Sequence, residues 1–119
     1  MKNNVIKEKS YSFALKIIDV YKYLIFEKKE YVLSKQLLKS GTSIGANVEE
    51  ALGGQSRKDF FSKMMIAYKE ARESHYWLRL IKDSNLMENN VVELYLNDCN
   101  ELLKIMGSIR KTMHEVDNF

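Results

Sequence analysis

Apolar residues recur along the chain at intervals of three and four positions, the period of an α-helix with one buried face. The first such segment is expected to begin near Ser10 or Ser12, either of which suits a helix N-cap. Its apolar residues form two neighbouring stripes, Phe13, Ile17, Val20 and Leu24 beside Ala14, Ile18, Tyr21 and Ile25. One intramolecular neighbour needs less apolar surface than this, so we expect part of it to be buried between subunits.

A second helix is predicted after the charged connection at residues 27–32, with Ser34 as its cap. Gly41 and Gly45 in its middle are four positions apart and therefore share one face. Each costs about 1 kcal/mol relative to alanine inside a helix, so the close approach of another helix is expected to offset this cost. The predicted packing motif consists of small and polar residues, Gly41, Ser43, Gly45, Ala46 and Asn47. Asn47 is expected to bond a neighbouring helix.

A third helix is predicted from Ser56, which follows the helix-ending pair Gly53-Gly54 and can cap the first turn. Its apolar seam repeats every seven residues through Phe60, Met64, Ala67, Ala71, Ser74, Leu78 and Ile81. The small residues in the middle of that seam match those of the second helix, so we expect these two helices to pack closely.

The fourth helix is expected to start around Glu88–Asn90 and to place Cys99 in its apolar seam. Four helical segments with short connections predict an all-α, antiparallel up-down-up-down four-helix bundle. We expect a single domain over residues 1–119, with an N-terminal tail at about 1–9. The absence of proline agrees with long, unbroken helices.

Charge is unevenly distributed along the sequence, although the whole chain carries only +3. Residues 1–48 hold nine lysines and four acids, a net +5, whereas residues 49–119 hold ten basic and twelve acidic residues, a net −2. A basic first half suits an anionic partner, and a solvated helix surface explains it equally well.

Cellular location is inferred from what the chain contains. One cysteine among 119 residues rules out an internal disulfide framework and suits a reducing compartment. The first residues lack the apolar run of a signal peptide, and no stretch is apolar enough for a membrane span. A cytoplasmic protein without membrane contact is therefore expected.

Catalytic patterns are weak throughout the chain. Di-iron bundles use Glu-x-x-His pairs, and no glutamate precedes His75 or His114 by three residues, so no metal or other cofactor is expected. Gly53-Gly54 followed by Ser56-Arg57-Lys58 lacks the spaced glycines of a Walker motif. Cys99 falls on a core seam with no histidine and acid partners in view. We therefore expect no enzyme and name no catalytic residue.

Aromatic residues beside cations leave two interpretations open. Tyr76 and Trp77 are close to Arg79 in sequence, and Tyr21 and Tyr23 flank Lys22. Such pairs stack on nucleic-acid bases in some proteins. Burial in the bundle core or in a subunit interface is the interpretation we favour for them.

Residues 30–51 carry the clearest resemblance, above all Gln36 followed by the pattern Ser43-Ile44-x-Ala46-Asn47-x-x-Glu50. Together with Ser56–Phe60, Ile66-Ala67 and the segment 70–78, they resemble the bacterial four-helix-bundle proteins encoded in 23S rRNA intervening sequences. This family is similar to the accessory variability determinant of diversity-generating retroelements. Nearly the whole chain takes part in the resemblance. Ala51 stands where the family commonly has glycine.

The resemblance implies a four-helix bundle that often assembles as a ring-shaped homopentamer. For the retroelement relatives it also implies nucleic-acid binding and contact with a reverse transcriptase, and it implies no catalytic residues. The family's positive surface maps here onto five basic residues, Lys35, Lys39, Arg57, Lys58 and Lys63. In a ring, the positive charge on the first half of each chain would add up.

Two functions are therefore expected from the sequence. The first is a non-enzymatic, oligomeric protein that binds RNA or DNA, with RNA favoured. The second is an interaction module or scaffold for a partner protein such as a reverse transcriptase. A carboxylate-metal enzyme is the disfavoured third.

Overall fold

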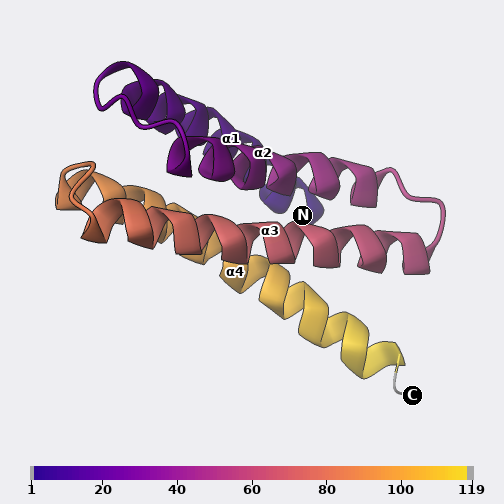
Figure 1. Ribbon diagram of the computed structural model, residues 1–119. Helices are drawn as coiled ribbons and strands as arrows, with labels where there is room; N and C mark the ends of the chain where they lie inside the picture. Colours follow the sequence, from indigo (N-terminus) through magenta and orange to yellow (C-terminus); the bar gives the residue numbers. More distant parts are fainter. Residues whose placement is uncertain (1, 118–119) are drawn as a thin grey trace.

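The computed structural model describes the backbone of residues 2–117 and the side chains of residues 5–115. Its four helices are α1 (Lys2–Phe26), α2 (Leu33–Leu52), α3 (Arg57–Asp83) and α4 (Asn89–Asp117), and no strand occurs among these residues. Figure 1 shows the helices side by side along one rod, about 50 Å long. The predicted all-α four-helix bundle is confirmed.

Contacts between successive helices establish that neighbours run antiparallel. Gly41 of α2 lies beside Ile17 of α1, and Gly45 farther along α2 lies beside the earlier Ser10 of α1. The same reversal of order appears in the pairs Lys63–Glu50 and Ser74–Ser40 (α3 with α2), Lys82–Glu93 and Ala71–Cys99 (α3 with α4), and Lys9–Glu101 and Lys16–Asp98 (α1 with α4). The connectivity is therefore up-down-up-down, closed by contacts between α1 and α4.

The first helix begins earlier than the sequence indicates. α1 starts at Lys2, so the predicted start near Ser10 or Ser12 is wrong, and residues 2–9 of the predicted tail are helical; Met1 lies outside the described residues. Ile6 is completely buried and lies seven positions before Phe13, on the same apolar stripe. Ser10 is buried and its Oγ donates to the carbonyl of Lys7 at 3.1 Å, inside the helix. Burial of Ile6 extends the helix past the expected cap.

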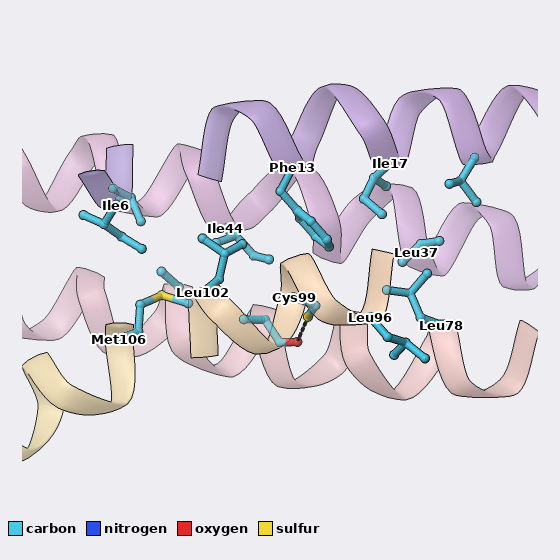
Figure 2. Packing of buried hydrophobic residues seen from close by; sticks show 14 of the residues in the cluster. Ile6, Phe13, Ile17, Leu37, Ile44, Leu78, Leu96, Cys99, Leu102 and Met106 are labelled. Atoms are coloured by element: carbon cyan, nitrogen blue, oxygen red, sulfur yellow. Dashed lines mark hydrogen bonds between the residues drawn. The ribbon is translucent and has the colours of Figure 1, made fainter. Parts of the chain in front are cut away.

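The predicted apolar seams form the core. Phe13, Ile17, Val20 and Leu24 of α1 are buried, as is every predicted seam residue of α3 from Met64 onward. Figure 2 shows Phe13, Ile17 and Leu78 among side chains of α2 and α4 in the interior of the bundle. The Sγ of Cys99 donates to the Ala71 carbonyl at 3.2 Å (dashed in Figure 2).

Glu30, and not Ser34, caps the second helix. Its carboxylate accepts from the backbone N–H groups of Val32, Leu33 and Ser34 at 3.1, 2.9 and 2.8 Å. Ser34 lies inside the helix, where its buried Oγ donates to the Glu30 carbonyl at 2.8 Å. The helix therefore starts at Leu33, and the predicted Ser34 cap is wrong because a carboxylate four residues upstream reaches all three donors.

The glycine face of α2 packs against α1. A Cβ placed on Gly41 would lie 2.8 Å from Cγ2 of Ile17, and one on Gly45 would lie 3.4 Å from the backbone oxygen of Ser10. The close packing expected between α2 and α3 is confirmed, but these two glycines face α1 and do not make that contact. α3 meets α2 one position away, where buried Ser74 donates from Oγ to Oγ of Ser40 at 2.8 Å.

Other residues of the predicted packing motif are less buried. Ala46 is exposed, and Ser43 and Asn47 are half-buried. Ser43 Oγ donates to the Lys39 carbonyl at 2.6 Å, and Asn47 Nδ2 donates to the Ser43 carbonyl at 2.8 Å. The expectation that Asn47 bonds a neighbouring helix is wrong, because its amide N–H group is used within α2.

The last helix leaves the bundle at its C-terminal end. In Figure 1 the yellow half of α4 diverges from α3. Met106 is the last fully buried residue among the described side chains of α4, and Ile109 and Met113, predicted to continue the seam, are only half-buried. Val116, the last residue of the predicted seam, has a side chain outside the described residues. The divergence opens space beside the outer surface of α3.

Candidate nucleic-acid interface

The five basic residues predicted from the sequence do not form one surface. Lys35 lies in the first turn of α2, and Arg57 and Lys58 follow its last turn, so the length of that helix, about 30 Å, separates them. Lys63 is half-buried and pairs with Glu50 of α2, with 3.2 Å between Nζ and Oε1. Lys39 is exposed on α2, and its charge acts on Glu70 of α3.

A different set of cations gathers on the outside of α3, next to α4. Its members line an open groove of about 630 Å³, together with Met65 and Glu73. We name this surface the basic face of α3, and it consists of Tyr68, Lys69, Arg72, Tyr76 and Arg79 of α3 with Arg110 of α4. Four cations thus share the groove with a single carboxylate, that of Glu73.

Helix geometry explains why these residues share a surface. Tyr68, Arg72 and Tyr76 are spaced by four and Arg79 follows by three, so they form one stripe along α3. The seam from Met64 to Ile81 faces the core, and Tyr68, one turn after Met64, lies at the edge of that seam and packs against the core. Arg110 reaches the groove from the part of α4 beyond its last fully buried residue.

Arg79 and Tyr76 are held in place by their neighbours. Arg79 Nε donates to Nδ1 of His75 at 3.1 Å, and its guanidinium carbon lies 5.6 Å from the centre of the Tyr76 ring. The Tyr76 ring packs edge-on against the Trp77 ring, with 5.1 Å between the two ring centres. Burial and the Arg79 charge hold the pKa of His75 below its usual value, against a hydrogen bond with Asn100 of α4 that raises it. Neutral His75 can therefore remain the acceptor for Arg79.

Arg72 and Arg110 have no hydrogen bond or ion pair with any other residue that the structure describes. Lys69 is exposed, and its charge acts on Glu70. Unpaired guanidinium groups provide bidentate donors for phosphate oxygens. The groove can therefore bind a polyanion, since a single carboxylate opposes four cations.

Sequence reasoning missed most of this surface because it averaged charge over halves of the chain. All four cations come from residues 49–119, the half with net charge −2. The four-residue spacing of Tyr68, Arg72 and Tyr76 is the feature of the sequence that indicates this surface. The helix brings Lys69, Arg72 and Arg79 into one groove with Glu73 as the single acid that lines it, which a count of charges along the chain cannot register. Of the aromatic pair beside Arg79, Trp77 packs against the core as expected, whereas Tyr76 is 46% exposed.

The features considered for catalysis lie elsewhere. Burial, followed by the Asp98 charge, raises the pKa of the Cys99 thiol to about 12, and the side chain is completely buried. The hollow at Gly53 and Gly54 is lined by the carboxylates of Glu50 and Asp59, which disfavour phosphate there. Among the described side chains, those of residues 5–115, no three from His, Cys, Asp or Glu gather as metal ligands.

No helix in the described part of the chain contains an apolar stretch long enough to cross a membrane.

Comparison with known proteins was made by family, by sequence and by structure. The family model described as 23S rRNA-intervening sequence protein matches residues 2–108. A crystal structure from Bacteroides thetaiotaomicron, of a protein with unknown function from the S23 ribosomal protein family, is similar with a TM-score of 0.91 and 50% identity. The match covers 93% of this chain and 99% of that one. No curated protein matches this chain.

Proposed function

The chain belongs to the 23S rRNA-intervening sequence protein family, and from that premise we propose that it is a non-enzymatic, oligomeric protein that binds nucleic acid in the cytoplasm. RNA is the favoured ligand. The observation that carries this proposal is the basic face of α3, where four cations and two tyrosines line one groove with a single acid. Phosphate contacts supply most of the affinity of such interfaces.

Binding should therefore depend on the arginines of this face and on salt. The double variant Arg72→Glu with Arg110→Glu is expected to weaken binding of a labelled RNA at least tenfold in fluorescence anisotropy. The slope of log affinity against log salt should also become shallower, by about 0.7 per lost contact on single strands. Circular dichroism should show an unchanged helix content, because both side chains project into the groove.

A matched control carries the same change in net charge elsewhere. Lys22→Glu with Lys28→Glu alters two exposed residues of α1 and the loop that follows it, away from the groove. Binding should stay within about threefold of wild type, because distant charges act only through the screened field of the molecule. Equal losses in both double variants would mean that net charge, and not this groove, governs binding.

The residues selected from sequence are tested separately. We propose that Lys35 and Lys39 extend the contact onto α2, so Lys35→Glu with Lys39→Glu should fold normally and bind more weakly. The same assay applies to Arg57, Lys58 and Lys63 at the opposite end of α2. Unchanged binding in these variants would restrict the interface to the basic face of α3.

A second function, the interaction module or scaffold for a partner protein such as a reverse transcriptase, is favoured by apolar surface on α1. Tyr11 and Leu15, four positions apart, are 59% and 50% exposed and line a shallow hollow with Glu49 of α2. Purification from the native host with and without nuclease treatment separates the two functions. A protein partner that remains after nuclease treatment, and is lost in Leu15→Glu, would support the scaffold.

A further inference from the structure

The tyrosines of the basic face are arranged in a way that phosphate binding alone does not require. Tyr68 and Tyr76 lie two turns apart on α3, about 12 Å along the axis, with Arg72 midway between them. An electrostatic surface for duplex backbones needs cations only, since sequence-independent affinity for a duplex comes from phosphate neutralisation. Aromatic rings interleaved with cations are instead characteristic of surfaces that stack unpaired bases.

Both rings contact neighbouring groups of the protein. Tyr76 is 46% exposed, with Trp77 edge-on to it and the Arg79 guanidinium 5.6 Å from its centre. Tyr68 is half-buried and spans the gap to α4, where a Cβ on Gly107 would lie 3.8 Å from its Cε1. Rings held by packing lose little side-chain entropy when a base stacks on them.

The cations are placed to follow a strand between these rings. Arg72 lies between the tyrosines and Arg110 reaches the same groove from α4. Arg79 uses Nε for His75, and its other four N–H donors have no hydrogen-bond partner among the described residues. These guanidinium groups can contact the phosphates on either side of a stacked base.

We infer that the basic face of α3 binds single-stranded nucleic acid, with bases stacked on Tyr76 and Tyr68 and phosphates held by Arg72 and Arg110. This inference rests on the proposed function and specifies the form of nucleic acid recognised. A duplex keeps its bases stacked on one another, so it offers this face phosphates alone. Unpaired loops and ends of RNA offer both unstacked bases and phosphates.

The test compares one single-stranded oligonucleotide with a duplex of the same sequence at fixed salt, for wild type, Tyr76→Leu and Tyr76→Phe. Tyr76→Leu keeps an apolar side chain but has no ring, and it is expected to weaken single-strand binding about 5- to 150-fold, the range for one stacked base. Duplex binding should change less than twofold. Tyr76→Phe retains the ring and should bind both as wild type does.

The only tryptophan of the chain gives an independent readout. Trp77 touches Tyr76, so single-strand binding should change its fluorescence, and duplex binding should not. Tyr68→Leu, compared with Tyr68→Phe, repeats the test on the second ring, with thermal unfolding measured because Tyr68 also packs against the core.

The outcomes separate this inference from the proposed function. Equal losses on single strand and duplex in Tyr76→Leu, or no loss on either, would overturn the stacking inference while leaving nucleic-acid binding intact. Wild-type protein that binds neither oligonucleotide at low salt would overturn both. Polyglutamate that competes as well as the single strand, per negative charge, would identify an acidic polypeptide as the ligand and overturn the inference.

Discussion

Gly41 and Gly107 show how one residue type serves different purposes in this bundle. A Cβ on Gly41 would lie 2.8 and 2.9 Å from the two γ-carbons of Ile17 and 3.1 Å from its Cβ. These atoms sit at the branch of a stiff side chain, which cannot move aside cheaply. A Cβ on Gly107 would meet only Tyr68, at 3.8 Å, an ordinary contact. Gly41 is therefore required by packing, whereas Gly107 is not.

Opposite stability effects should follow from the same substitution at these two positions. Gly41→Ala gains about 1 kcal/mol of helix propensity but forces α1 and α2 apart, and overpacking typically costs about 1–3 kcal/mol. We expect a net loss in the free energy of unfolding measured in urea. Gly107→Ala should raise that free energy by up to about 1 kcal/mol, because its new methyl group meets no obstacle.

The clash can be assigned to Ile17 by a double-mutant cycle. Ile17→Ala alone removes both γ-carbons and should destabilise the bundle by about 2–5 kcal/mol. Adding Gly41→Ala to that background should then be neutral or stabilising, because the new methyl group occupies the vacated space. Additive losses would show that Gly41 is constrained by something other than this side chain.

At the scale of one element, α2 depends on a carboxylate that lies outside it. The Glu30 side chain accepts three backbone N–H groups of the first turn, at 2.8 to 3.1 Å. Lys29, just before it, has a φ of 54°, the left-handed region that lysine seldom adopts. The left-handed conformation of Lys29 costs free energy, and the capping contacts of Glu30 offset that cost.

The cap predicts a pH dependence of stability. Partial burial raises the pKa of Glu30, but the hydrogen bonds from Leu33, Ser34 and Val32 outweigh it, so the pKa is lowered from 4.5. A lowered pKa in the folded state means that the stabilisation is complete above pH 4.5 and is lost as the pH falls through the folded value.

Glu30→Gln should test this directly, because the amide cannot ionise. We expect it to cost about 0.5–2 kcal/mol at pH 7, the range for helix caps, and much less at pH 3, as measured by urea unfolding at each pH. Glu27→Gln is the control, since Glu27 is exposed in the same connection and its side chain accepts no hydrogen bond within the described chain. If the free energies of unfolding of Glu30→Gln and wild type differed by the same amount at pH 7 and pH 3, the pH dependence would not come from the Glu30 cap.

At the scale of the whole molecule, the surface of a single chain exposes several large apolar side chains. Leu94 of α4 is 64% exposed, beside the Lys16–Asp98 ion pair that joins α1 to α4. Tyr11 and Leu15 of α1 add further exposed area. The second stripe predicted for the first helix, Ala14, Ile18, Tyr21 and Ile25, is half-buried, whereas Tyr11 and Leu15 lie outside the predicted face. Exposed apolar residues of this kind are the surface that the proposed oligomer would cover.

Light scattering after gel filtration should therefore give a mass above the 14.0 kDa of one chain, and about five times that value for the pentamer implied by the resemblance. Leu94→Glu together with Leu15→Glu is expected to shift the mass towards one chain with helix content retained, because both residues are exposed within a chain. Thr112→Glu, on an exposed position of α4, should leave the mass unchanged. A wild-type mass of one chain would contradict the oligomer.

The sequence alone determined the helix content, the order of the elements and most of the core. Period-3.6 apolar spacing is a local property, so the seam of α3 from Met64 onward could be identified residue by residue, whereas the seams of α1 and α4 were identified only in part. Ser56 was identified as the α3 cap, and it accepts from the Asp59 N–H. The resemblance carried by residues 30–51 identified the family. Each of these features depends on neighbours within one or two turns.

Only the tertiary structure decided which faces meet. The sequence matched the small residues of α2 to those of α3, whereas the rotation of α2 about its axis turns Gly41 and Gly45 towards α1 and Ser40 towards α3. Ile6 extended α1 because its burial partners lie on other helices. Arg110 joins the tyrosines and arginines of α3 across more than thirty residues of sequence. Such contacts depend on how helices turn and diverge, which no single stretch of sequence encodes.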